Sequence, residues 1–161
     1  MAISAKVQRT ELGLFSSVVC FKAVVVGIED ALGAKAAAIA LIAAGRKRGR
    51  ELAQGLGLVN NGEDVALSAL GEKLNHVLGA NGTRLCIVDK VEQVGDVYQV
   101  YTRETICSYA EEEGSTRSCT YTMGALQGIL EIFLGKKLKG TQTGSVLRGA
   151  EHDILEYSVL G

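Results

Sequence analysis

The stretch CTYTMGALQGILEIFLG, from Cys119 to Gly135, decides how this chain is expected to fold. Its larger apolar side chains recur at the spacing of an amphipathic helix, at Met123, Leu126, Leu130 and Phe133/Leu134. Gly135 stands where a C-terminal glycine ends a helix. Gly124 and Gly128 lie one turn apart on one side, and each costs about 1 kcal/mol of helix propensity relative to alanine. We therefore expect a neighbouring strand, a partner helix or a flat ligand to approach the backbone closely there.

Two strands are predicted after this helix, Thr141 to Arg148 and Asp153 to Val159, about a turn at Gly149-Ala150. In the second strand Leu155, Tyr157 and Val159 alternate with polar residues, which is the pattern of a half-buried strand.

The stretch from Cys119 to Val159 resembles the C-terminal signature of the 4-vinyl reductase domain family, also called hydrocarbon-binding domains. That pattern has a cysteine, a glycine five residues later, another glycine four residues on, Leu-Gly-Arg/Lys, and then Cys-x-x-x-Gly-x-x-x-Cys across two strands. The matching positions here are Cys119, Gly124, Gly128, Leu134-Gly135-Lys136 and Gly149. Ser145 and Asp153 stand where the family usually has its last two cysteines.

The resemblance implies an α+β fold shared with TRAPP trafficking subunits and haem/nitric-oxide sensor domains. We expect a helix-rich N-terminal half packed on a small antiparallel sheet, in one domain over residues 1–161, with the signature best matched in 119–159. It also implies a homodimer that encloses an apolar ligand pocket.

The earlier part of the chain is predicted to supply three helices and a pair of strands. The helices are expected over 15–32, 34–56 and 65–78, and the strands over Leu85–Lys90 and Tyr98–Thr105 around a turn at Val94-Gly95-Asp96. Met1–Thr10 is expected to be a strand or a loose arm, and Glu111–Ser115 an exposed acidic loop.

Composition limits the class of protein. The net charge of −1 gives no electrostatic case for a nucleic-acid partner, which normally leaves a basic face. Four cysteines without a Cys-x-x-Cys pair, and no signal peptide, predict reduced thiols in a cytoplasmic protein. No apolar run reaches the roughly 18 residues of a membrane span, so a soluble chain is expected. A photosynthetic role would place it at the periphery of a photosynthetic membrane, in contact with membrane-protein assembly partners.

A ligand pocket is expected where small residues lie beside large apolar ones. The predicted pocket residues are Phe21, Tyr101, Tyr121, Met123, Gly124, Leu126, Gly128 and Phe133. The alternative is that these residues fill a tightly packed core or a dimer interface.

The resemblance implies a ligand such as a chlorophyll-type tetrapyrrole or a phenol-like aromatic. His76 or His152 would then be the candidate axial ligand of a tetrapyrrole metal, or simply a surface histidine. Arg46 and Arg50, in the basic end of the second helix, would contact an acidic group of the ligand or merely face solvent.

A zinc site is expected to be lost, because zinc wants four ligands in a tetrahedral array and Ser145 is a poor one. Cys119 and Asp153 remain as a remnant, and Glu104, Cys107 and His152 lie near enough in sequence to be recruited.

Catalysis by this chain alone is not expected. Gly55-Leu56-Gly57 lacks the later glycine of a dinucleotide fingerprint, and no nucleophile and base are arranged together. The leading interpretation is a non-enzymatic binding protein for an apolar molecule, plausibly in pigment handling or photosystem assembly, with vinyl-group reduction conceivable only with a partner. The alternatives are a dimeric interaction scaffold with a filled core and an aromatic-hydrocarbon sensor domain.

Overall fold

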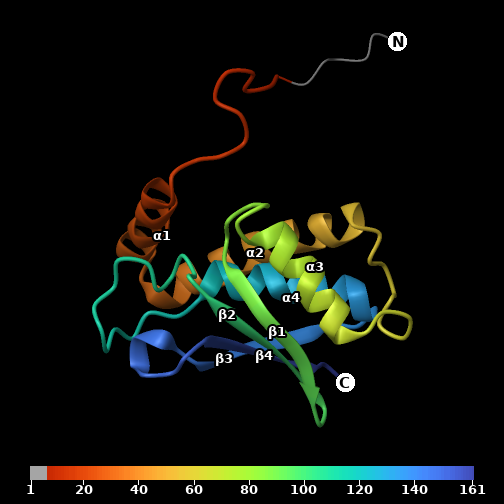
Figure 1. Cartoon of the computed structure of the whole chain (residues 1–161). Helices are drawn as coiled ribbons and strands as arrows, with labels where there is room; N and C mark the ends of the chain where they lie inside the picture. Colours follow the sequence, from red (N-terminus) through yellow and green to blue (C-terminus); the bar gives the residue numbers. More distant parts are fainter. Residues whose placement is uncertain (1–6) are drawn as a thin grey trace.

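A computed structural model describes residues 7–161, which form an antiparallel sheet with helices layered against it (Figure 1). The helices are α1 (Val18–Leu32), α2 (Ala34–Gly55), α3 (Leu67–Leu78) and α4 (Thr120–Leu134). The strands are β1 (Ile87–Val94), β2 (Val97–Arg103), β3 (Leu138–Gly144) and β4 (Asp153–Val159), and a short 3-10 helix, η1 (Val146–Arg148), precedes β4. The sheet order is β1-β2-β4-β3, with every neighbouring pair antiparallel. The α+β fold class predicted from the sequence is confirmed.

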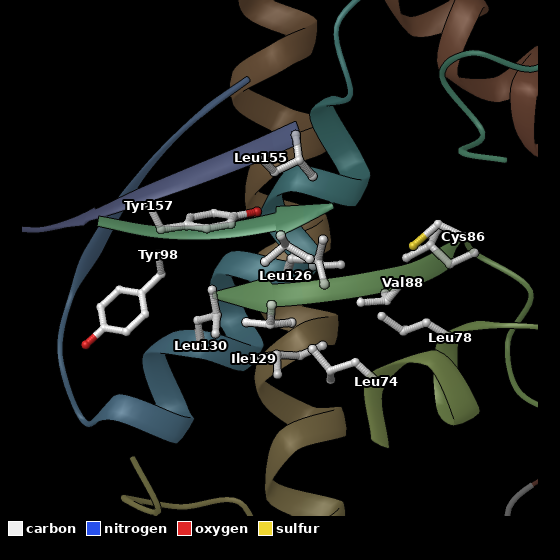
Figure 2. Packing of buried hydrophobic residues seen from close by; sticks show 14 of the residues in the cluster. Leu74, Leu78, Cys86, Val88, Tyr98, Leu126, Ile129, Leu130, Leu155 and Tyr157 are labelled. Atoms are coloured by element: carbon white, nitrogen blue, oxygen red, sulfur yellow. The ribbon is translucent and has the colours of Figure 1, made fainter. Parts of the chain in front are cut away.

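Helix α4 lies at the centre of the molecule, between the sheet and α2 (Figure 1). Leu126, Ile129, Leu130 and Phe133 of α4 have no solvent-exposed surface, and Figure 2 shows the first three of them facing residues of the sheet and of α3. Burying a side chain of this size contributes about 1.5–3 kcal/mol. Gly135 ends the helix in the left-handed region at φ 66°, as its position in the sequence predicts.

The glycines of α4 are explained by its crossing with α2. A Cβ atom added at Gly124 would lie 2.2 Å from the carbonyl oxygen of Ile42, and one at Gly128 would lie 2.1 Å from that of Arg46. The contact is reciprocal, because a Cβ atom at Gly45 or Gly49 of α2 would meet the backbone of α4 at 2.2 and 1.9 Å. Of the three elements expected to approach these glycines, it is a partner helix of the same chain that does so.

The first helix begins three residues later than predicted, because Ser17 caps it. The Ser17 side chain accepts a hydrogen bond from the backbone N–H of Val19, and this satisfies one of the donors left free at a helix N-terminus. The valine-rich run that follows is helical, as expected, and Gly33 separates α1 from α2 at φ 80°. Within residues 7–161 no helix has the length and apolar character needed to cross a bilayer.

Two other predictions need correction. The strand predicted over Thr141–Arg148 ends at Gly144, and the residues after Ser145 turn into η1. The cause is that Asp153 accepts the N–H of Val146 and Ser145 accepts the N–H of Leu147, so these donors are not available to a neighbouring strand. The predicted exposed acidic loop has a half-buried member, Glu111, which is paired with two cations.

The N-terminal segment is described only from residue 7 onward. The strand or arm predicted over Met1–Thr10 falls partly outside the described residues. Residues 7–10 are exposed and form no strand.

Candidate ligand-binding site

A cavity of about 930 Å³ lies where α1, α2 and α4 meet the loop that follows β2. Its apolar wall comes from helices, from the turn before β1 and from that loop, through Phe21, Leu52, Leu78, Leu85, Ile106 and Ile129. Its more exposed lining residues include Leu14, Phe15, Arg48, Arg84, Glu104 and Tyr109. The volume falls within the roughly 300–1,000 Å³ of small-molecule sites, which are mostly apolar with a few polar groups.

Helix α1 forms one wall of the cavity, and a buried lysine fixes the position of this helix. Lys22 donates from Nζ to the backbone oxygens of Ile106, at 3.3 Å, and Cys107, at 2.8 Å, and it forms an ion pair with Glu111 at 2.9 Å. Hydrogen bonding from Lys22 lowers the pKa of the Glu111 carboxyl, which keeps that partner charged. Arg117 adds ion pairs to Glu111 and to Glu29 of α1. These contacts hold α1 to the loop that forms the opposite wall.

Two aromatic rings meet at one end of the cavity. Phe21 of α1 and Tyr121 of α4 are in edge-to-face contact, with ring centroids 5.1 Å apart. Such pairs contribute about 0.5–1.5 kcal/mol beyond the area that they bury. Burial raises the pKa of the Tyr121 hydroxyl, so this group stays neutral and able to donate a hydrogen bond.

Of the predicted pocket residues, Phe21 and Tyr121 lie together in the cavity lining, and the others lie elsewhere. Gly124 and Gly128 face α2, and Leu126 and Phe133 are buried in the core. Met123 is half-buried beside Gly140 of β3, and its carbonyl oxygen accepts a hydrogen bond from Tyr157 at 2.7 Å.

Tyr101, also a predicted pocket residue, contacts residues that do not line the cavity. Its hydroxyl donates to Glu92 at 2.8 Å, and its ring packs against His152 with the centroids 5.6 Å apart. Whether any of the predicted residues contacts a ligand stays a prediction.

Neither predicted axial histidine lines the cavity. His76 is exposed in the last turn of α3. The Nε2 atom of His152 lies 3.0 Å from a carboxylate oxygen of Asp89, and the His152 ring packs against Tyr101. The cavity lining among residues 7–161 therefore offers no imidazole to a tetrapyrrole metal.

Arg46 and Arg50 hold an acidic group of their own chain. Arg46 donates from Nε and Nη2 to the two carboxylate oxygens of Glu131, each at 2.8 Å, and Arg50 donates from Nη2 at 2.7 Å. The backbone N–H of Leu138 donates to the same carboxylate at 3.0 Å. Burial alone would raise the pKa of Glu131, but the hydrogen bonds from Arg46, Leu138, Arg50 and Gln127 outweigh it and lower the pKa to about 2. These arginines thus serve the contact between α2 and α4, and a contact with an acidic group of a ligand stays a prediction.

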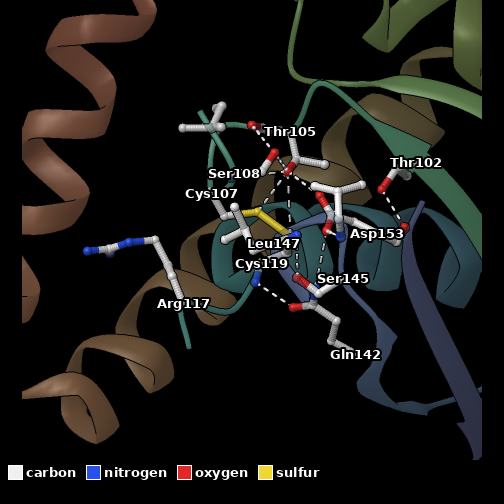
Figure 3. The surroundings of a disulfide bond; sticks show 12 residues. Thr102, Thr105, Cys107, Ser108, Arg117, Cys119, Gln142, Ser145, Leu147 and Asp153 are labelled. Carbon is white, nitrogen blue, oxygen red and sulfur yellow. Dashed lines mark hydrogen bonds between the residues drawn. A yellow bond between two sulfur atoms is a disulfide. The ribbon is translucent and has the colours of Figure 1, made fainter. Parts of the chain in front are cut away.

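The residues of the predicted metal remnant come together next to the cavity (Figure 3). One ligand atom from each of Cys107, Cys119 and Asp153 lies within 4.8 Å of the others, and all three residues are buried. However, Cys107 and Cys119 form a disulfide, with their Cα atoms 5.1 Å apart. The expectation of reduced thiols throughout the chain is therefore wrong for this pair, while Cys20 and Cys86 are free.

The same cluster does not fit a four-ligand zinc site in the disulfide form. Thiolates are what bind zinc, and the two sulfurs are bonded to each other. The Asp153 carboxylate accepts hydrogen bonds from Thr105 at 2.7 Å and from the N–H of Val146 at 3.0 Å. Ser145 points its hydroxyl oxygen to the N–H of Leu147. The positions of the family cysteines are thus occupied by a crosslink and a hydrogen-bond network.

Sequence reasoning missed the residues that arrive from loops, above all Leu85 and Ile106. Both are apolar residues outside the regular part of a strand, and the structure buries them against α3 and α4. Arg48 belongs to the same basic end of α2 as Arg46 and Arg50, but the sequence does not show that it lines the cavity while those two neighbours bind Glu131.

Solved structures of two other proteins share this fold. No family model and no curated protein matches the chain by sequence. The phenol-responsive sensory domain of the transcription activator PoxR, solved with phenol, aligns with a TM-score of 0.64 and 14% identity over 91% of this chain and 76% of that chain. A trafficking protein particle complex subunit 3 from Naegleria fowleri, covalently bound to palmitic acid, aligns with a TM-score of 0.53 and 12% identity over 90% of this chain and 98% of that chain. At these identities the likeness shows the fold, which is the one that the resemblance to 4-vinyl reductase domains implies.

Proposed function

We propose that this chain is a non-enzymatic binding protein that holds an apolar small molecule in the cavity between α1, α2, α4 and the loop after β2. The observation that carries the proposal is a cavity of about 930 Å³ whose lining includes leucine, isoleucine and aromatic side chains beside polar ones. Small-molecule sites are clefts or cavities of this size with a mostly apolar lining and a few polar groups, so this space is the candidate for a ligand.

The solved structures support an apolar ligand in a fold of this kind. One of the two similar proteins was crystallised with phenol, and the other carries palmitic acid. Both of those ligands present mostly hydrocarbon surface, which the leucine- and isoleucine-rich wall here would also accept.

An aromatic ligand is the narrower form of the proposal that the lining favours. The edge-to-face pair of Phe21 and Tyr121 can extend to a third ring, and the neutral hydroxyl of Tyr121 can donate to a polar substituent. An aromatic-hydrocarbon sensor would use these features. A chlorophyll-type tetrapyrrole, implied by the family resemblance for pigment handling or photosystem assembly, would have to bind without an imidazole from the lining.

Binding of a neutral aromatic dye tests the proposal. Phenylnaphthylamine fluoresces strongly when it leaves water, so titration of the protein gives a dissociation constant. Leu52→Trp adds bulk to the cavity wall and is expected to weaken binding at least tenfold. Leu56→Trp is the matched control, because Leu56 is similarly half-buried one turn further along but does not line the cavity. Absence of binding by the unaltered protein, or equal loss in both variants, would contradict the proposal.

Tetrapyrrole binding has a separate test. Protein purified from its native source should show an intense visible absorption band if it carries such a pigment. A spectrum with protein absorption only would remove the tetrapyrrole form of the proposal and leave the wider one standing.

A second function, association with another copy of the chain, is favoured by the exposed face of α1. Val19 and Val24 are 57% and 54% exposed, and from Val18 to Ile28 the one charged residue is Lys22, which is buried. Apolar surface of this extent on a helix is typical of an interface. Val24→Asp is expected to convert a dimer into a monomer in light scattering, whereas Val59→Asp, beyond the other end of α2, should not. A monomeric unaltered protein would end this proposal, and with it a role as a dimeric scaffold.

A further inference from the structure

We infer that the ligand of the cavity is an amphiphile, an apolar molecule that carries one acidic group, and that Arg48 and Arg84 bind the acidic group at the cavity mouth. This inference rests on the proposed function, since it names the class of ligand for the same cavity. The first observation that supports the inference is that the cavity lining contains both buried apolar residues and exposed charged ones. Leu78 and Ile129 are buried, whereas Arg48 and Arg84 are exposed and line the same space.

The charges of the lining are unbalanced. Two guanidinium groups, those of Arg48 and Arg84, stand against one carboxylate, that of Glu104. Elsewhere in the described residues, arginines that touch the core hold a carboxylate of the same chain within hydrogen-bond distance: Arg46 and Arg50 hold Glu131, and Arg117 holds Glu29 and Glu111.

The guanidinium groups of Arg48 and Arg84 at the mouth have N–H donors that remain available to a ligand. Arg48 lies 3.8 Å from Glu51, and both side chains are about half exposed, at 51% and 52%. A surface pair of this kind is weak, because water and salt screen it. Arg84 donates from Nε to the backbone oxygen of Ala80 at 3.3 Å and is stacked over the ring of Phe15, 5.5 Å from its centroid. Within residues 7–161 no carboxylate lies within ion-pair distance of Arg84.

Arginine suits this task chemically. Its planar guanidinium presents paired donors that match the two oxygens of a carboxylate or the oxygens of a sulfonate or phosphate. A hydrogen bond to a charged group contributes about 1.5–3 kcal/mol, and 1.4 kcal/mol is a tenfold change in affinity. The head group would lie at the mouth with water on one side, and the apolar body would lie against Leu52, Leu85 and Ile106.

A matched pair of dyes tests the inference. Anilinonaphthalene sulfonate and phenylnaphthylamine share one aromatic skeleton and differ by a sulfonate group, which stands in for the acidic head. The unaltered protein should bind the anionic dye about tenfold more tightly than the neutral one. Arg48→Gln and Arg84→Gln should each reduce the affinity for the anionic dye about tenfold while the affinity for the neutral dye changes less than twofold.

Lys47→Gln is the control, because it removes a positive charge from the same turn of α2 at a residue that does not line the cavity. It should change neither affinity by more than twofold. Equal weakening of both dyes by the arginine variants, an effect of Lys47→Gln as large as theirs, or a preference for the neutral dye would each overturn the inference. Failure of the unaltered protein to bind the neutral dye would instead count against the proposed function, so the two outcomes are distinguishable.

Discussion

The disulfide between Cys107 and Cys119 is expected to contribute about 3 kcal/mol to the free energy of unfolding. The two cysteines are 12 residues apart in sequence. In the chain-entropy account, closing a loop of this length removes about 10 cal/mol/K from the unfolded ensemble, which at 25 °C gives that value. The bond also anchors the loop whose residues Thr105 and Ile106 line the cavity, so its loss should loosen one cavity wall.

Chemical denaturation with and without a thiol reductant measures this contribution. Reductant should lower the unfolding free energy of the unaltered protein by about 3 kcal/mol. The double variant Cys107→Ser, Cys119→Ser should be less stable by a similar amount and insensitive to reductant. Cys20→Ser is the control, because Cys20 is exposed and free, and it should leave the response to reductant unchanged.

A thiol count completes the test. Under denaturing, non-reducing conditions two thiols should react, those of Cys20 and Cys86, and four after reduction. In the folded protein Cys86 should stay unreactive, because burial, reinforced by the charge of Asp153, raises its pKa to about 12. Four reactive thiols before reduction, together with an unfolding midpoint that ignores reductant, would refute the reasoning and restore the expectation of reduced cysteines.

Four further predictions follow from the contact between α2 and α4 and from α1. Glu131→Gln should reduce acid sensitivity: the lowered pKa contributes up to about 3 kcal/mol above pH 4.5, lost as the pH falls from about 4.5 to 2, so unfolding free energies measured across this range should fall less steeply in the variant. Gly49→Ala should cost at least about 2 kcal/mol in thermal or chemical unfolding, because the new Cβ would lie 1.9 Å from the carbonyl oxygen of Ala125, and a neutral result would contradict the close crossing. Gly27→Ala, in open space on α1, should instead stabilise the protein by about 0.5–1 kcal/mol in the same assay. Ser17→Ala should cost about 1 kcal/mol through loss of the N-cap, and an unchanged midpoint would show that α1 does not depend on it.

The sequence predicted well the elements that depend on local pattern. The period of α4 and the glycine at its end are properties of neighbouring residues, and so is the alternation of Leu155 and Tyr157 in β4. The close approach at Gly124 was also predictable, because a glycine in a helix interior carries a cost that packing must offset. The sequence could not show which of the three candidate elements approaches Gly124. The answer depends on Gly45 and Gly49, which lie in a helix about eighty residues earlier.

Contacts between distant loops set the rest. The sequence shows no signal that Cys107 and Cys119 are paired, because a spacing of 12 residues is compatible with a bond only when the intervening loop folds back. The cavity has the same origin, since Phe21, Leu85 and Ile106 come from three separate segments that line one space, and Lys22 ties the first of these segments to the third. A helical stripe such as Leu126 and Phe133 looks the same in sequence whether it faces a ligand or a core, and here it faces the core.

The arginines at the basic end of α2 have two different roles. Arg46 and Arg50 turn inward to Glu131, while Arg48 turns to the cavity mouth. The ion pairs of Arg46 and Arg50 therefore join α2 to α4 without using the side chain that faces the cavity. A protein engineer could exchange Arg48 for other residues, to change what the cavity accepts, and leave the ion pairs between the two helices intact.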